Sequence, residues 1–149
     1  MQIINCIKRD FSNAIRKRCY ERGCLLNLKG LNIKVVLKGE EVCENIKICD
    51  CIIFTIRNII GIVELTKTLS DSKEIVEKLN NGTNIASKIL ENYNNIQQRN
   101  FEFYHIVLFN KCSHHSEIKV IRNSKIKVRG INHDIFPARC GYLLSRLIS

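Results

Sequence analysis

This 149-residue sequence lacks the features that would divide it or tie it to a membrane. It has one proline, Pro137, and no linker, internal repeat or low-complexity block, so we expect one domain over residues 1–149. No apolar run reaches the roughly 18 residues of a membrane span. The N-terminus also lacks the charged-then-apolar pattern of a signal peptide. These absences predict a soluble, cytoplasmic protein without a membrane partner.

Motifs for several common chemistries are missing as well. Glycine-rich phosphate loops and nucleophile elbows are absent, which argues against a P-loop nucleotide hydrolase and leaves serine or cysteine hydrolysis without local support. The eight cysteines form no CxxC pair and no zinc-finger spacing, so we expect structural thiols, with disulfides as the alternative for a hyperthermophile. Cys112, His114 and His115 are too close in sequence for one tetrahedral metal site, and His105 reads as a core histidine.

Positive charge is what the sequence has in excess. Lysine and arginine number 24 against 14 acids, which gives a net charge of +10 and a pI near 9.4. Such a chain is drawn to polyanions, and nucleic acid, DNA above all, is the expected partner. The candidate backbone-binding residues are Arg16 and Lys17 on an early helix, and Arg122 and Lys125 on a late hairpin. Ordinary solvated faces are the alternative, and the few aromatic residues give little support for stacking on single-stranded bases.

Hydrophobic periodicity predicts an α/β fold in the order helix, three strands, helix, strand. A central mixed β-sheet flanked by helices is the expected architecture, with a C-terminal β-hairpin extension and a short amphipathic tail. The Asn80-Asn81-Gly82 triplet should weaken, kink or split the second helix. The expected elements are a helix over 10–22, strands over 31–37, 46–56 and 59–67, a helix over 71–96, a strand over 101–109, and a hairpin over 118–128.

Two acids lie inside the most apolar segments of the chain. Asp50 is the only acid in the run 46–56, and Glu64 is the only acid in the run 59–67. A buried carboxylate persists when it is paired, hydrogen-bonded or bound to metal. Two converging carboxylates with a nearby lysine are what magnesium-dependent phosphodiester hydrolysis requires. The alternatives are a backbone-satisfied Asp50 and a Glu64 that reaches solvent at a strand end.

Strand parity makes this hypothesis testable, because side chains alternate between the faces of a sheet. A two-residue turn at Arg57-Asn58 would place Asp50 and Glu64 on opposite faces. A three-residue loop over residues 56–58 would pair Thr55 with Ile59 and set Asp50 opposite Glu64. The site hypothesis therefore predicts an odd loop or a β-bulge.

The two acidic segments resemble the motifs of the PD-(D/E)XK nuclease superfamily, also called restriction-endonuclease-like. Ile48-Cys49-Asp50-Cys51-Ile52 is similar to its first motif, and Ile62-Val63-Glu64-Leu65-Thr66-Lys67 is similar to its second. The resemblance covers residues 10–110 and implies a helix–strand–strand–strand–helix–strand core. It also implies a DNA endonuclease in which Asp50 and Glu64 bind Mg²⁺ or Mn²⁺ and Lys67 assists catalysis. Such nucleases often act as dimers, and the apolar tail, with Leu143, Leu144 and Leu147, would offer a homodimer contact or join the core.

The sequence departs from that pattern at the lysine. The usual position, two residues after Glu64, holds Thr66, and Lys67 comes one residue late. A bulge would turn Lys67 inward, or Lys73 or Lys78 of the following helix would replace it. The alternative is a catalytically inactive relative that binds nucleic acid or supports an assembly. Glu21 resembles an extra acid that some members carry on the first helix, although a solvated helix-end glutamate is the simpler interpretation.

Overall fold

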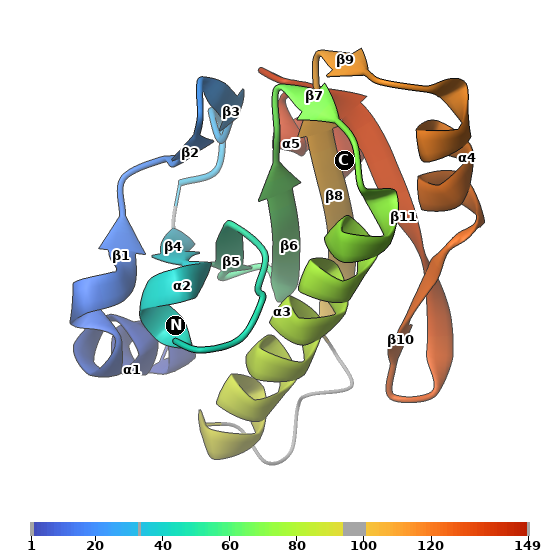
Figure 1. The fold of residues 1–149 in the computed structure, drawn as a ribbon. Coiled ribbons are helices and arrows are strands. Elements are labelled where there is room, and N and C mark those ends of the chain that lie inside the picture. Colours follow the sequence, from blue (N-terminus) through green and yellow to red (C-terminus); the bar gives the residue numbers. More distant parts are fainter. Residues whose placement is uncertain (1, 33, 94–100, 149) are drawn as a thin grey trace.

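A seven-stranded mixed sheet forms the centre of the protein, as the computed structural model shows (Figure 1). The structure describes residues 2–32, 34–93 and 101–148, so Ile33 and the predicted helix end at residue 96 lie outside the described residues. In spatial order the strands are β1 (Ile15–Arg16), β4 (Lys34–Lys38), β5 (Cys51–Thr55), β6 (Ile59–Leu65), β8 (Glu102–Phe109), β11 (Ile131–Arg139) and β10 (Lys125–Val128).

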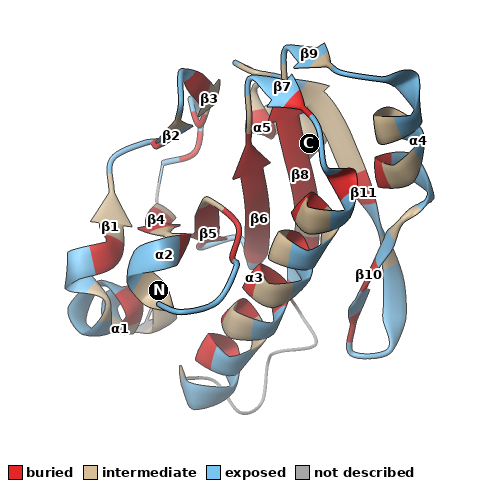
Figure 2. Ribbon diagram, in the orientation of Figure 1, coloured by how far each residue is buried: buried red, intermediate tan, exposed pale blue. Residues whose placement is uncertain are grey.

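The strand directions divide the sheet into two halves. β4, β5 and β6 form an antiparallel meander, whereas β8 runs parallel to β6 and β11 runs parallel to β8. A parallel pair needs a long crossover, and the helix α3 (Ser72–Tyr93) supplies it between β6 and β8. Every residue of β5 and β6 is buried, which confirms the prediction that these apolar runs are central strands (Figure 2).

Each face of the sheet is covered by a different layer. The helices α1 (Gln2–Asp10), α3 and α4 (His115–Asn123) pack on one face, where Ile7, Ile62 and Leu79 share a core. The hairpin of β2 (Cys19–Glu21) and β3 (Cys24–Leu26) covers the other face together with α5 (Leu144–Leu147). Leu144 belongs to that second core, so the C-terminal tail packs inside the molecule. None of the helices in the described part of the chain is long and apolar enough to cross a membrane.

The predicted first helix over residues 10–22 is wrong. The helix α1 ends at Asp10, and the following residues form the 3₁₀ turn η1 (Ser12–Ala14), β1 and the β2–β3 hairpin. Arg22 and Gly23 both have positive φ, 50° and 77°, as a two-residue hairpin turn requires. Gly23 therefore turns a hairpin instead of ending a helix, and burial of Cys19 and Leu26 against the sheet overrides the helical spacing.

The late part of the chain also differs from the prediction. Residues 118–123 belong to the helix α4, because Ile118 and Ile121 are spaced three apart and pack toward the same core. The hairpin exists, but it joins β10 and β11. Pro137 lies in the part of β11 that pairs with β8 but no longer with β10. Its missing backbone N–H therefore costs no hydrogen bond to β10. The remaining short elements are α2 (Gly39–Val42), β7 (Thr68–Leu69) and β9 (Lys111–Cys112).

Four of the eight cysteines form disulfides, which corrects the expectation of structural thiols. Cys19 bonds Cys51, and Cys24 bonds Cys140, across 32 and 116 residues of sequence. Both bonds attach the β2–β3 hairpin to the rest of the molecule. The fold creates these pairs between distant segments, so spacing along the chain did not reveal them. Cys6, Cys43, Cys49 and Cys112 remain thiols.

Candidate active site

Asp50 and Glu64 meet between β5 and β6. Cys51 pairs with Val63 and Phe54 pairs with Ile60, so the connecting loop is the odd loop over residues 56–58. This register confirms the parity prediction and sets the position of Asp50 opposite Glu64. Asp50 lies directly before β5, and its Oδ2 accepts a hydrogen bond of 2.8 Å from the backbone N–H of Leu65. Both acids therefore belong to one site on the α3 side of the sheet.

Glu64 is the more deeply buried of the two acids. It is 3% exposed, and its Oε2 lies 3.3 Å from the Nζ of Lys78. Its other oxygen, Oε1, is buried and has no hydrogen-bond partner. A buried carboxylate oxygen without a partner is costly, and either a proton shared with Asp50 or a bound cation would satisfy it.

The surroundings of Glu64 favour its protonated form. Burial, and next the charge of Asp50, raise the pKa of Glu64 to about 8, although the Lys78 ammonium works in the opposite direction. Near neutral pH Glu64 is therefore largely protonated. A divalent cation would reverse this by favouring the deprotonated carboxylate, so the pair is suited to exchange a proton for a metal ion.

Arg22 reaches the pair from the tip of the β2–β3 hairpin. Its Nη1 lies 3.5 Å from Oδ2 of Asp50 and donates a 2.9 Å hydrogen bond to the carbonyl oxygen of Leu65. One guanidinium therefore links an oxygen of the acidic pair to a strand carbonyl. The Arg22 side chain remains 55% exposed, so this contact is open to solvent.

The helix α3 carries Lys78 into the site by packing closely against the segment before Asp50. The backbone N–H of Cys49 donates to the carbonyl of Lys78 at 3.2 Å, and Nδ2 of Asn81 donates to the carbonyl of Lys47 at 2.6 Å. A Cβ on Gly82 would lie 2.4 Å from Sγ of Cys49, so only glycine permits this approach. The Asn80-Asn81-Gly82 triplet thus sits in a continuous helix, and the predicted break is wrong.

A second glycine fixes the backbone of Asp50 itself. The N–H of Gly39 donates to the carbonyl of Asp50 at 3.0 Å. A Cβ on Gly39 would lie 1.9 Å from the carbonyl oxygen of Cys49, which no side chain could tolerate. The start of β5 is therefore held between the β4–α2 junction and α3.

Lys78, and not Lys67, is the lysine that contacts the acidic pair. The side chain of Lys67 lies beside Gly23, where a Cβ would come within 2.6 Å of the Lys67 Cε. A cavity of about 240 Å³ at Glu64 is lined by Arg22, Thr66 and Lys78, and Lys67 is not part of its wall. Of the two helix lysines expected as replacements, Lys78 points into the site and Lys73 is exposed.

The two carboxyl groups of Asp50 and Glu64 are the kind of ligand that magnesium prefers. Within residues 2–32, 34–93 and 101–148 no group of three or more His, Cys, Asp or Glu is placed to hold a metal ion. Magnesium, however, is usually held by one or two carboxylates, with water and substrate phosphate completing its shell. Asp50 and Glu64 match that requirement. Glu21 ends β2 and lines the same cavities as Asp50 rather than lying on a first helix.

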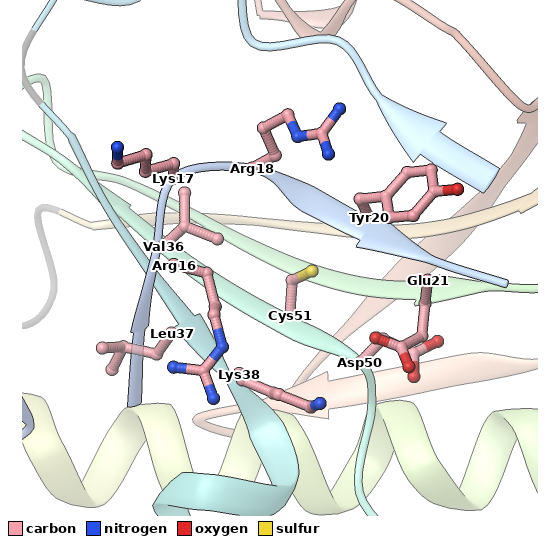
Figure 3. Close-up of a pocket in the computed structure, with 10 residues that line it drawn as sticks. All are labelled: Arg16, Lys17, Arg18, Tyr20, Glu21, Val36, Leu37, Lys38, Asp50 and Cys51. Atoms are coloured by element: carbon pink, nitrogen blue, oxygen red, sulfur yellow. The ribbon is translucent and has the colours of Figure 1, made fainter. Parts of the chain in front are cut away.

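The predicted backbone-binding residues lie near the two edge strands of the sheet, but Arg16 is in β1 instead of a helix, and Arg122 is in the helix α4 instead of a hairpin. Arg16 and Lys17 lie at β1 and line a cavity that ends at Asp50, as Figure 3 shows. Arg122 and Lys125 line a second cavity at β10, on the opposite edge, where Lys125 pairs with Asp134. The acidic pair lies between these two basic edges.

The histidines considered in the sequence analysis lie outside the site of Asp50 and Glu64. His105 is buried, and its Nε2 hydrogen-bonds Oγ1 of Thr83 at 2.9 Å, which confirms a core histidine. Burial lowers the pKa of His105 to about 4, so it stays neutral. His114 and His115 begin the exposed helix α4.

No protein-family model, curated protein or solved structure matches this chain.

Proposed function

We propose that this protein is a metal-dependent DNA endonuclease of the PD-(D/E)XK type that hydrolyses phosphodiester bonds. Asp50 and Glu64 would hold Mg²⁺ or Mn²⁺, and Lys78 would take the role expected of Lys67. One observation carries the proposal: Asp50 and the buried Glu64 bring two carboxyl groups together in one site that the Lys78 ammonium contacts.

The chemistry of the reaction explains this combination of groups. A bound cation neutralises charge on the scissile phosphate and lowers the pKa of an attacking water. The Lys78 ammonium, held beside Glu64 by α3, would orient that water or stabilise the charge that develops on the phosphoryl oxygens. Arg22 would add a second positive group on the Asp50 side of the site.

The chain order supports the restriction-endonuclease-like core that the motif resemblance implies. The elements α1, β4, β5, β6, α3 and β8 follow the order helix–strand–strand–strand–helix–strand. Asp50 directly precedes the second of these strands and Glu64 lies in the third, close to the positions that the resemblance implies.

Plasmid nicking tests the proposal directly. The native protein should relax supercoiled DNA with Mg²⁺ or Mn²⁺ but not with EDTA. Asp50→Asn and Glu64→Gln should each reduce nicking by at least about 100-fold, because each removes a metal ligand without changing side-chain volume. Glu77→Gln is the matched control, since Glu77 is an exposed acid of α3. Equal nicking by native protein, Asp50→Asn and Glu64→Gln would contradict the proposal.

A catalytically inactive nuclease-like protein that binds nucleic acid or supports an assembly is the second candidate. The contact that favours it is Arg22, whose guanidinium already bridges Asp50 and the Leu65 carbonyl where a cation would find oxygen ligands. An inactive binder should bind DNA with a steep salt dependence, need no metal and cut nothing. Mg²⁺ binding by Arg22→Ala distinguishes the two candidates. A nuclease should bind Mg²⁺ up to about 5-fold more tightly once this exposed, competing guanidinium is removed. An inactive protein should still bind no Mg²⁺.

Location and assembly are part of the same proposal. A cytoplasmic setting fits the two disulfides in hyperthermophilic archaea and bacteria, whose intracellular proteins are rich in such bonds. A homodimer would supply two sites for two strands. The tail expected to mediate it is committed to the core at Leu144, so another surface would have to form the contact.

A further inference from the structure

The geometry points to the cavity beside Asp50 as a subsite for one unpaired nucleotide of the substrate strand, with its base stacked on Tyr20 and its phosphates on the surrounding cations. The inference rests on the proposed function, because it names the form of nucleic acid that would reach the acidic pair.

The cavity has the size and position that this role needs. Its volume is about 350 Å³, within the range of pockets that hold small ligands. The β1–β2 segment forms one wall with Arg16, Lys17, Arg18 and Tyr20 (Figure 3). Asp50 lies beside Glu21 at one end of this cavity, so a group bound there would adjoin the proposed catalytic centre (Figure 3).

Tyr20 presents a partly exposed aromatic ring at this cavity. Its side chain is 46% exposed, and the guanidinium of Arg18 covers one face of the ring at 4.9 Å from the centroid. A base would therefore stack on the other face of the ring or on the Arg18 guanidinium, since bases stack on both kinds of group. The sequence gives little support for base stacking because its aromatic residues are few and mostly in apolar strands, but Tyr20 lies on the exposed side of β2.

The charges around Tyr20 fit a phosphodiester chain. Four cationic side chains and two carboxylates line the cavity, which leaves a positive balance. Arg16 is oriented by hydrogen bonds of 3.0 and 2.9 Å from its Nη1 to the carbonyls of Asn13 and Ile15. Lys38 pairs with Glu40 at 3.0 Å on the far wall. A neutral aromatic ligand would leave this excess charge unused, whereas a nucleotide would meet it with phosphate.

A disulfide holds the stacking surface at a fixed place relative to the acid. Tyr20 follows Cys19, Asp50 precedes Cys51, and Cys19 and Cys51 are bonded with their Cα atoms 5.9 Å apart. A rigid arrangement of this kind reduces the entropy lost when a flexible strand binds.

Stacking on Tyr20 selects an unpaired base. In a duplex, neighbouring bases cover both faces of each base, so a base that contacts the Tyr20 ring must first leave the stack. A single strand, a flap or a frayed end provides such a base at little cost, and a blunt duplex does not.

Tryptophan fluorescence tests this subsite without any catalysis. The sequence contains no tryptophan, so Tyr20→Trp creates a single reporter at the proposed stacking surface. A 10-nucleotide oligothymidylate, titrated in EDTA, should quench this fluorescence, and a blunt duplex of equal length should quench it much less. Tyr104→Trp is the matched control, because Tyr104 lines the cavity at the other basic edge. Absence of quenching, equal quenching by the duplex, or quenching at Tyr104→Trp alone would overturn the inference.

Affinity gives a second and independent readout. Tyr20→Phe should bind the single strand within about 2-fold of the native protein, whereas Tyr20→Leu should bind at least about 5-fold more weakly. Equal affinities for Phe and Leu would count against stacking. Because these titrations contain no metal, they separate the two proposals. Quenching without metal-dependent cleavage of either the plasmid or a single-stranded oligonucleotide retains the subsite and rejects the nuclease. Cleavage without quenching does the reverse.

Discussion

The Nζ of Lys78 lies 3.3 Å from Oε2 of Glu64, although the two residues come from a helix and a strand 14 positions apart in the sequence. The contact compensates for Thr66, which occupies the position where the motif resemblance expects a lysine. It depends on α3 lying against Cys49, and on Gly82, which permits that approach.

Removing the Lys78 ammonium should impair catalysis while leaving the fold intact. We expect Lys78→Met to lower the nicking rate by about 100-fold, the size of a lost electrostatic contact in a water-poor site. Lys73→Met is the control, since Lys73 is an exposed lysine of the same helix. Equal rates for the two variants, with circular dichroism spectra unchanged, would remove Lys78 from the mechanism.

Metal affinity should depend on pH through Glu64. Its pKa of about 8 means that below this pH a metal ion must displace a proton. The apparent affinity for Mg²⁺ should therefore rise with pH, approaching tenfold per unit, and level off above about pH 8. Isothermal titration calorimetry from pH 6 to 9 measures this, and Glu64→Gln should bind no Mg²⁺ at any pH in that range. An affinity independent of pH in the native protein would contradict the assignment.

The same proton makes stability depend on pH in the absence of metal. Between about pH 5 and pH 8 the folded protein keeps a proton on Glu64 that the unfolded chain has already released. The contribution of Glu64 to the free energy of unfolding should thus decline as pH rises through this window and then become constant. Urea unfolding in EDTA, compared between native protein and Glu64→Gln, isolates that contribution, and a difference that stays constant from pH 5 to 8 would contradict it.

The approach of α3 to Cys49 should make Gly82 intolerant of a side chain. Alanine gains up to about 1 kcal/mol of helix propensity over glycine, but overpacking costs about 1–3 kcal/mol. We expect Gly82→Ala to lower the free energy of unfolding, and Cys49→Ala to reduce that loss by removing the Sγ 2.4 Å from the new Cβ. Urea denaturation of the single and double variants measures the coupling, and a stabilising Gly82→Ala would refute the packing argument.

The two disulfides predict a definite thiol count. The denatured but unreduced protein should expose four reactive thiols, and the reduced protein eight. Replacing Cys19 and Cys51 by serine should lower the free energy of unfolding by about 2–5 kcal/mol, because the bond closes a long loop. Eight thiols before reduction would show that the hairpin is not covalently attached.

The central sheet and the acidic pair could be predicted because their signals are local. Two apolar runs separated by three loop residues fix the parity that sets Asp50 opposite Glu64, and both strands are buried as their composition indicates. The helix α3 follows from its own periodicity in the same way.

The partners of the acidic pair could not be predicted from the sequence, because tertiary packing supplies them. Lys78 was one of three candidate lysines, and the docking of α3 on Cys49 decides between them. Arg22 contacts Asp50 only because residues 19–26 form a hairpin. Burial of the apolar side chains of Cys19 and Leu26 outweighs the helical spacing of that segment. The α4 helix shows the reverse error, since the segments 118–120 and 126–128 on either side of residues 122–124 indicated a hairpin.

Electron paramagnetic resonance of bound Mn²⁺ tests the central claim most directly, because it counts metal ions without requiring a substrate. The account predicts saturable binding of Mn²⁺ at the acidic pair in the native protein, competed by Mg²⁺, and its loss in both Asp50→Asn and Glu64→Gln but not in Glu77→Gln. A native protein that binds no Mn²⁺, or that binds it equally well after both substitutions, would contradict the account.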